Sequence, residues 1–65
     1  MTRQFLLTER ETRIMQLLQS GCTNLDISEQ CGISVNTIKY HLKRIYKKLE
    51  VQNRAEAVFR FKNER

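Results

Sequence analysis

Residues 34–49 carry two faces of opposite character. At a helical step of about 100° per residue, apolar residues at this spacing share one narrow stripe, which contains Ile38, Leu42, Ile45 and Leu49. The opposite side carries cations together with one amide and one aromatic ring, namely Asn36, Lys39, Tyr40, Lys43, Arg44 and Lys47. The pattern predicts a long helix that is buried on one side and offers basic side chains on the other. The alternative is a basic face that meets only solvent.

Capping signals and glycines predict where a first helix begins and ends. Thr8-x-x-Glu11 has the form of a capping box, in which the two side chains satisfy each other's backbone N–H groups. The helix is expected to run from Thr8 to Gly21, because glycine commonly ends helices. Its apolar stripe, expected to be buried, is Ile14, Leu17 and Leu18. Residues 1–6 are expected to be a lead-in.

A second helix is expected from Thr23 to Gly32, with Ile27 and Cys31 four residues apart on one side. Ser34 is the expected N-cap of the long helix, because serine oxygens accept hydrogen bonds from the first free N–H groups of a helix. A three-residue turn therefore separates the two helices. Two helices joined in this way, the second of them basic, form a helix-turn-helix.

Asn53-x-x-Glu56 is similar to a capping box with asparagine as the cap, and it predicts a fourth helix over residues 53–65. The helical signals leave no segment for a strand. We therefore predict an all-α fold: a compact four-helix domain over residues 1–65, containing a helix-turn-helix at 23–49 with a long recognition helix.

Two phenylalanines of the fourth helix cannot both enter one core, because Phe59 and Phe61 point roughly 200° apart. One apolar side holds Ala55, Val58 and Phe59, and the other holds Ala57 and Phe61. A domain this small buries one side in itself, and the exposed phenylalanine suits a contact between two copies. The candidate dimer residues are Ala57, Val58, Phe59 and Phe61, and a frayed last turn is the alternative.

The charge of this 65-residue chain is uneven, although its net value is +5. Residues 1–34 hold three cations against four carboxylates, and residues 35–65 hold nine cations against three carboxylates. Such a basic half indicates a polyanion as partner. A membrane surface is the competing polyanion, but it requires a helix with a wide apolar face. The narrow stripe favours DNA, whose major groove admits a helix.

The chain lacks the residue groups of a metal or catalytic site. Cys22, Cys31 and His41 do not have the spacing of a metal-ligand set, so we expect them to have structural roles. No nucleophile–base pair and no paired carboxylates are recognisable, so we expect no cofactor and no enzyme activity. The longest apolar runs have two or three residues. We therefore expect no leader, no membrane span and a cytoplasmic protein.

Four ordered motifs cover residues 7–58. They are Leu7-Thr8-x-Arg10-Glu11, Gly21-x-Thr23-Asn24-x-x-Ile27, Ile33-Ser34-x-x-Thr37-Ile38-Lys39-x-His41-Leu42, and Ile45-Tyr46-x-Lys48-Leu49 with Val51, Arg54 and Ala57-Val58 after it. In this order and spacing they resemble the LuxR-type (FixJ/GerE-like) helix-turn-helix domain. The resemblance implies a bacterial transcription regulator that binds double-stranded DNA on the nucleoid as a homodimer. RNA polymerase is a further candidate partner.

The resemblance implies that Lys39, Tyr40 and Lys43 read bases in the major groove, and the same residues lie opposite the apolar stripe. Asn36, near the start of the helix, is a fourth candidate. Phosphate contacts are implied at the starts of two helices, and two long cations add to them, which together gives Thr23, Asn24, Ser34, Thr37, Arg44 and Lys47. The implied dimer contact is the fourth helix.

Some of these roles have alternatives. Lys39 and Lys43 each suit a base or a phosphate, because a lysine ammonium is a flexible point charge. Tyr40 packs against a thymine methyl, bonds a phosphate or is a partly buried surface aromatic. Asn36 alternatively meets only solvent. Lys48 is expected at a phosphate or in solvent.

The chain departs from the family pattern at Arg13, Leu25 and Glu50. Leu25 removes one implied phosphate contact. Glu50 replaces a glycine that ends the long helix, so either Glu50 is strained or the helix end is built differently. Competing functions are a promoter-recognition region of a sigma factor, against which the fourth-helix motifs argue, and a helical module that binds an acidic protein.

Overall fold

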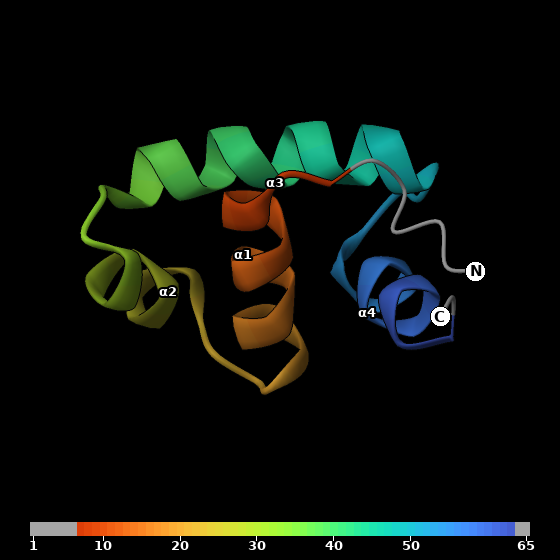
Figure 1. Ribbon diagram of the computed structural model, residues 1–65, viewed down its shortest axis with the longest axis horizontal. Coiled ribbons are helices and arrows are strands. Elements are labelled where there is room, and N and C mark those ends of the chain that lie inside the picture. Colours follow the sequence, from red (N-terminus) through yellow and green to blue (C-terminus); the bar gives the residue numbers. More distant parts are fainter. Residues whose placement is uncertain (1–6, 64–65) are drawn as a thin grey trace.

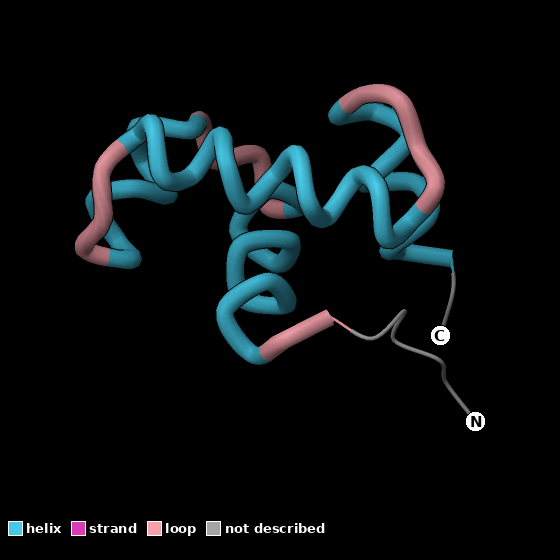
Figure 2. The backbone as a smooth tube through the Cα atoms, turned by 90° about the horizontal axis from the view of Figure 1, so that it is seen from above, coloured by secondary structure: helices cyan, strands magenta, loops and turns pink. Residues whose placement is uncertain are grey.

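The computed structural model describes residues 7–63, which form four α-helices and no strand. In chain order these are α1 (Glu9–Gln19), α2 (Asn24–Cys31), α3 (Val35–Leu49) and α4 (Arg54–Asn63). α3 lies along one side of the molecule, and α1, α2 and α4 lie on its other side (Figure 1). Figure 2 shows α3 from above, running along the length of the molecule. The predicted all-α, four-helix fold is confirmed, while the predicted lead-in at 1–6 and the last two residues lie outside the described residues.

The first two helices both begin with a capping box, of which the sequence predicted the one at Thr8 and Glu11 and, at the second, only the start at Thr23. At α1 the Thr8 hydroxyl accepts a hydrogen bond from the Glu11 N–H at 3.1 Å, and the Glu11 carboxylate accepts one from the Thr8 N–H at 3.0 Å. Thr23 and Asp26 form the same reciprocal pair at α2, with both distances 3.1 Å. Each pair satisfies two N–H groups that a helix start leaves unpaired, and a cap of this kind is worth about 1 kcal/mol.

The two later helices use simpler caps. The Ser34 hydroxyl accepts a hydrogen bond from the Thr37 N–H at 3.1 Å, and the Asn53 side-chain oxygen accepts one from the Glu56 N–H at 2.9 Å. Glu56 does not return a bond to Asn53. Its carboxylate instead accepts a hydrogen bond from the Gln52 N–H at 2.7 Å. The start of α4 therefore differs from a capping box, in which this carboxylate would accept from the Asn53 N–H.

Three residues in the left-handed conformation mark the helix ends. Gly21 and Gly32 have φ angles of 94° and 71°, as expected of glycines that end α1 and α2. Glu50 follows α3 with φ 59° and ψ 46°. A side chain in this conformation costs roughly 1 kcal/mol. The sequence left open whether Glu50 is strained or the helix end is built differently. The structure has a strained Glu50.

The core lies where α3 meets the other helices, and its buried residues are Ile14, Met15, Leu18, Ile27, Ile38, Leu42, Ile45, Leu49 and Ala57. The predicted apolar stripe of α3 is confirmed in full. The prediction for α1 is wrong in part, because Leu17 is only partly buried whereas Met15 is fully buried. Cys22 and Cys31, for which structural roles were predicted, are partly buried and pack against this core.

A charged pair joins α1 to the last turn of α3. Only 3% of Glu11 is exposed, and its carboxylate contacts Lys48 Nζ at 2.7 Å. The prediction that Lys48 meets a phosphate or solvent is wrong, because a buried carboxylate needs a partner of opposite charge. Burial raises the pKa of Glu11, but the hydrogen bonds from Lys48 and Thr8 and the charges of Lys48 and Arg44 outweigh it and lower that pKa below its usual value.

Candidate nucleic-acid interface

The outer face of α3 is exposed along the whole helix. The six polar residues predicted for it are all exposed: Asn36, Lys39, Tyr40, Lys43, Arg44 and Lys47. The other three helices lie on the opposite side of α3 (Figure 1, Figure 2). The sequence has no carboxylate between Val35 and Leu49, so no acidic group of the helix itself neutralises these cations.

The residues of this face point in different directions. At about 100° per residue, Tyr40 and Lys47 lie within about 10° of the direction opposite the centre of the buried stripe. Lys39 lies about 90° from that direction on one flank, and Arg44 lies about 50° from it on the other flank. The aromatic ring therefore stands in the middle of a strip of cations, with lysine at one edge and arginine at the other.

Tyr40 has two aromatic or cationic neighbours on α3. Its ring meets the His41 ring edge to face, with centroids 5.8 Å apart and planes at 65°. The guanidinium carbon of Arg44 lies 5.8 Å from the centre of the Tyr40 ring. The side chain is 58% exposed, so the rest of its surface is covered and the ring is accessible from solvent. These contacts were not predicted from the sequence, although Tyr40 and Arg44 have the four-residue spacing of side chains that meet on a helix.

The predicted phosphate residues at the helix starts are arranged by the caps. The Ser34 and Thr37 hydroxyls are 3.0 Å apart and hydrogen-bonded, and both belong to the first turn of α3. At α2, Thr23 is exposed, whereas Asn24 is partly buried and its side-chain oxygen is buried without a hydrogen-bond partner in the described chain. The N–H groups of Asn24 therefore remain as its donors toward an anion. Helix starts suit anions because their free N–H groups carry partial positive charge.

A small basic hollow lies at the other half of α3. It is open, measures about 180 Å³ and is lined by Arg44, Lys47 and Lys48. Lys48 is bound to Glu11, as described above. Arg44 and Lys47 are exposed, whereas Lys48 is partly buried.

The apolar residues of α4 divide between the core and the surface. Ala57 is fully buried, and Phe61 is partly buried against the core. Phe59 is 70% exposed, and Val58 is partly buried. Ala57 was predicted as a dimer contact, but a residue enclosed by its own monomer cannot contact a second copy. An open hollow of about 500 Å³ beside Phe59 is lined by Glu50, Val51, Ala55, Glu56, Phe59 and Arg60.

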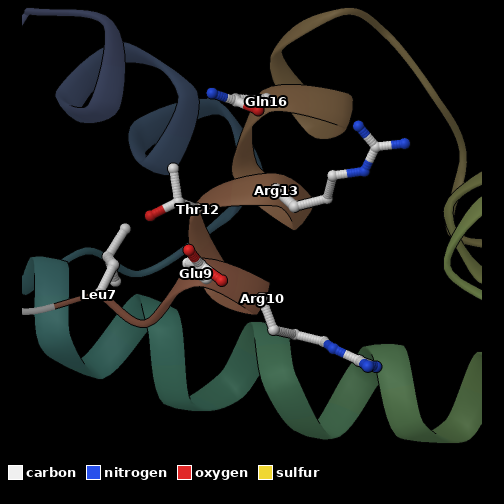
Figure 3. A pocket seen from close by; sticks show the side chains of 6 residues that line it. All are labelled: Leu7, Glu9, Arg10, Thr12, Arg13 and Gln16. Carbon is white, nitrogen blue, oxygen red and sulfur yellow. The ribbon is translucent and has the colours of Figure 1, made fainter.

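Another open hollow, of about 590 Å³, lies on the outer surface of α1. It is lined by Leu7, Glu9, Arg10, Thr12, Arg13 and Gln16. Arg10 and Arg13 extend to one side of the helix, and Leu7 and Thr12 lie on the other side (Figure 3). All six residues belong to α1 or precede it directly, so this hollow is separate from the outer face of α3.

Features of other kinds of site are few in the part of the chain that the structure describes. Cys22 and Cys31 are free thiols, and no group of three His, Cys, Asp or Glu side chains within residues 7–63 is placed to hold a metal ion. None of the helices in this range combines the length and the apolar character needed to cross a membrane.

Comparison with known proteins finds close relatives over most of the chain. The curated protein described as probable transcriptional regulatory protein SgaR, of Hyphomicrobium methylovorum, is 56% identical over 52 residues, which are 80% of this chain and 25% of that protein. The chain spans about a quarter of the length of the curated relatives it matches.

Two solved structures have the same fold. The DNA-binding domain of the response regulator ComA, solved in complex with the anti-activator RapF, superposes with a TM-score of 0.87 and 40% identity, covering 89% of this chain and 100% of that chain. The transcription factor GerE superposes with a TM-score of 0.79 and 40% identity, covering 85% of this chain and 82% of that chain. The family model of bacterial regulatory proteins of the luxR family (GerE) matches residues 6–61. The chain therefore belongs to the luxR family of bacterial regulatory proteins.

Proposed function

We propose that this chain is the DNA-binding unit of a bacterial, sequence-specific transcription regulator and that α3 lies in the major groove. The carrying observation is the outer face of α3, which is exposed, basic and free of carboxylates, opposite a stripe that is fully committed to the core. A helix with this geometry fits the major groove of B-DNA. Membership of the luxR family and the likeness to GerE and the ComA domain support the proposal.

The proposed contacts divide into base readers and phosphate contacts. Asn36, Lys39, Tyr40 and Lys43 face the base edges, where lysine donates to guanine and asparagine to adenine. The DNA phosphates are contacted by residues at the starts of α2 and α3 and by one lysine in the second half of α3. These residues are Thr23, Asn24, Ser34, Thr37 and Lys47. Phosphate contacts set the register of the protein on DNA, and base contacts supply the sequence preference.

We expect the sequence preference to depend on the lysines of the outer face. Duplexes selected from random DNA and then footprinted define the preferred site. Lys39→Ala or Lys43→Ala should cost about 1–3 kcal/mol and relax the preference at one base position if that lysine contacts a base. The matched control is Lys47→Ala, which should weaken binding to all sequences equally. If neither Lys39→Ala nor Lys43→Ala changes the preferred site or the ratio of its affinity to that of random DNA, the base readers are assigned wrongly.

The chain is further proposed to bind two half-sites as a homodimer through α4, with Phe59 and Val58 at the contact. Phe59 is the exposed phenylalanine, and exposed aromatic rings beside apolar neighbours suit a two-fold helix contact. Half-sites about one helical turn apart would then each receive one α3. If the two copies together neutralise about eight phosphates, log K should fall with log salt at a slope near −7. A slope shallower than about −3 would contradict two engaged helices.

The two phenylalanines supply a matched test of the dimer. Phe59→Glu should leave the domain folded by circular dichroism but monomeric in sedimentation, with loss of cooperative binding to DNA that carries two half-sites. Phe61→Glu should unfold the domain, because it places a charge against the core. If Phe59→Glu stays folded and binds this DNA as the parent does, α4 is not the dimer contact.

A second candidate function is binding of an acidic protein by the same basic face. Binding of a protein in general is supported by the ComA domain, whose structure was solved in complex with the anti-activator RapF, and the net basic charge of the face favours an acidic partner. Both kinds of binding weaken with salt, whereas only DNA binding protects a defined sequence in a footprint. RNA polymerase as a partner, a location in the cytoplasm on the nucleoid, and the absence of enzyme activity belong to the DNA-binding proposal as further expectations.

A further inference from the structure

Tyr40 and Arg44 form one unit on the outer face of α3. Arg44 follows Tyr40 by about one helical turn, and its guanidinium carbon lies 5.8 Å from the centre of the ring, within the range of a cation–π contact. His41 packs its ring against the same tyrosine with centroids 5.8 Å apart. The Tyr40 ring is 58% exposed. It is therefore a surface ring that is held by neighbours on its own helix.

Arg44 has no competing polar partner among residues 7–63. Glu11 interacts with the charge of Arg44, but its carboxylate is bonded to Lys48 at 2.7 Å. The structure gives Arg44 no hydrogen bond and no ion pair within that range. A guanidinium carries five N–H donors in a fixed plane, so the donors of Arg44 remain available to a ligand.

The contact with Tyr40 turns Arg44 toward the first half of α3. Long side chains on a helix lean toward its N-terminus, and here the guanidinium group lies near a ring that belongs four positions earlier. In a helix-turn-helix the N-terminal residues of the second helix contact base edges. Arg44 thus reaches from the second half of the helix back to the part that meets bases.

We propose that Arg44 reads a guanine in the major groove and that Tyr40 positions it there. This inference rests on the proposed function, because it requires α3 to lie in the groove. Guanine offers O6 and N7 as two acceptors, and the parallel N–H groups of a guanidinium match both of them. A guanidinium held over an aromatic ring by a cation–π contact is oriented before binding, so less freedom is lost when the contact forms. The earlier expectation that Arg44 contacts a phosphate is replaced.

Conservative variants separate this role from a phosphate contact. The duplex that the parent chain selects is compared with duplexes in which each position is changed in turn. Arg44→Lys keeps the charge but not the planar donors, and Tyr40→Leu removes the ring. Both variants should lose the preference for one and the same G·C pair by about tenfold or more. Tyr40→Phe, which keeps the ring, should retain that preference, and the salt slope should be unchanged in all three variants.

The combined variant and a charge control complete the experiment. Tyr40→Leu together with Arg44→Lys should lose no more of the G·C preference than Arg44→Lys alone, because the two residues act on one contact. Lys47→Ala should reduce the salt slope by about 1 without changing any base preference. Circular dichroism of each variant shows that the domain is folded.

Two results would overturn the inference while leaving the proposed function intact. In the first, Arg44→Lys keeps every base preference and Arg44→Ala weakens all sequences alike, which makes Arg44 a phosphate contact. In the second, Tyr40→Leu keeps the G·C preference that Arg44→Lys loses, so Tyr40 does not position Arg44. If the parent chain itself selects no sequence, the proposed function and this inference both fail.

Discussion

The two ends of α3 are built in different ways. Before its first turn, Gly32 and Ser34 form a tight corner in which the bonds join neighbours in sequence, such as the N–H bond that Ser34 accepts at 3.1 Å. In its last turn, Lys48 binds Glu11 across 37 positions of the chain, and Leu49 is fully buried. The first end combines local hydrogen bonds with the packing of Ile38 in the core, and the second end adds a charged pair between residues far apart in the sequence.

This difference separates a part that presents side chains from a part that holds the fold. Caps of about 1 kcal/mol each help to hold the first end, where the first of the proposed base readers stand. The last turn of α3 binds α1 through Lys48 and lies next to the start of α4, so changes there disturb contacts between helices. Changes at the first end should mainly alter DNA binding, whereas changes at the second end should mainly alter folding.

The largest expected effect is loss of core packing at the second end. Leu49→Ala should reduce the free energy of unfolding by about 2–5 kcal/mol, which is large against the roughly 3–10 kcal/mol expected for a domain of this size. Val35→Ala, at the first end and only partly buried, is the matched control and should cost less. Urea unfolding measures both. Equal losses would remove the distinction between the two ends.

The next effect concerns the charged pair that joins α1 to α3. Lys48→Met leaves the buried carboxylate of Glu11 without its cation, and we expect a loss of about 1–3 kcal/mol at neutral pH. The control is Lys47→Met, one position earlier and exposed, which should change the free energy of unfolding by less than about 0.5 kcal/mol. Comparable losses of unfolding free energy in the two variants would show that the Glu11–Lys48 pair stabilises the domain no more than an exposed lysine does.

The same pair predicts how stability depends on pH. The folded state lowers the pKa of Glu11 from its ordinary value of 4.5. The stabilisation is therefore complete above that value and is lost as the pH falls through the lower, folded pKa. Urea unfolding of the parent should show this acid loss. In Lys48→Met the slope should flatten, because burial without the cation no longer favours the carboxylate. Identical slopes would contradict the role given to Lys48.

The smallest effects concern the backbone at the two corners and have opposite signs. Glu50→Gly removes the strain of a side chain at φ 59°, so it should stabilise the domain by up to about 1 kcal/mol after the loss of unfolded-state entropy. Gly32→Ala should destabilise by about 1 kcal/mol, through strain alone, because nothing lies within 4 Å of the added Cβ. Urea midpoints at constant m-value measure both changes. A shift of the same sign in both variants would contradict the assignment.

Much of the fold was predictable because its signals are local. The stripe from Ile38 to Leu49 has helical spacing, and all four of its residues are buried. Gly32 and Ser34 mark a corner by their chemistry, since glycine tolerates positive φ and serine accepts an N–H bond. For the same reason Asn53 predicted the start of α4. These choices depend on residues within about one helical turn of one another.

The burial of Glu11 was not predictable in this way. Its place in a capping box is a local feature, and that part of the prediction is confirmed. Its enclosure and its contact with Lys48 depend on how α1 crosses α3, which no short window of sequence encodes. A lysine in a basic strip was therefore predicted at a phosphate, although the packed structure uses it to neutralise a buried carboxylate.

The candidate site shows the same division. The exposure of Lys39, Tyr40 and Lys43 followed from helical spacing, and it is confirmed. The contact of Arg44 with the Tyr40 ring had a signal in its four-residue spacing, but the rotamers that form it depend on the surrounding side chains. Which functional contacts these residues make stays a prediction that the experiments above test.

Sequence alone determined the helices, their caps and the two faces of α3, because hydrophobic spacing and hydrogen-bonding side chains act over a few residues. The tertiary structure alone decided that Phe61 turns inward and Phe59 outward, that Ala57 belongs to the core, and that α1 and α3 share a charged pair. The physical reason is that these outcomes depend on the docking of whole helices. The sequence pattern gives α4 two apolar sides and does not distinguish them. The direction in which α4 docks on the core decides which of the two sides is buried.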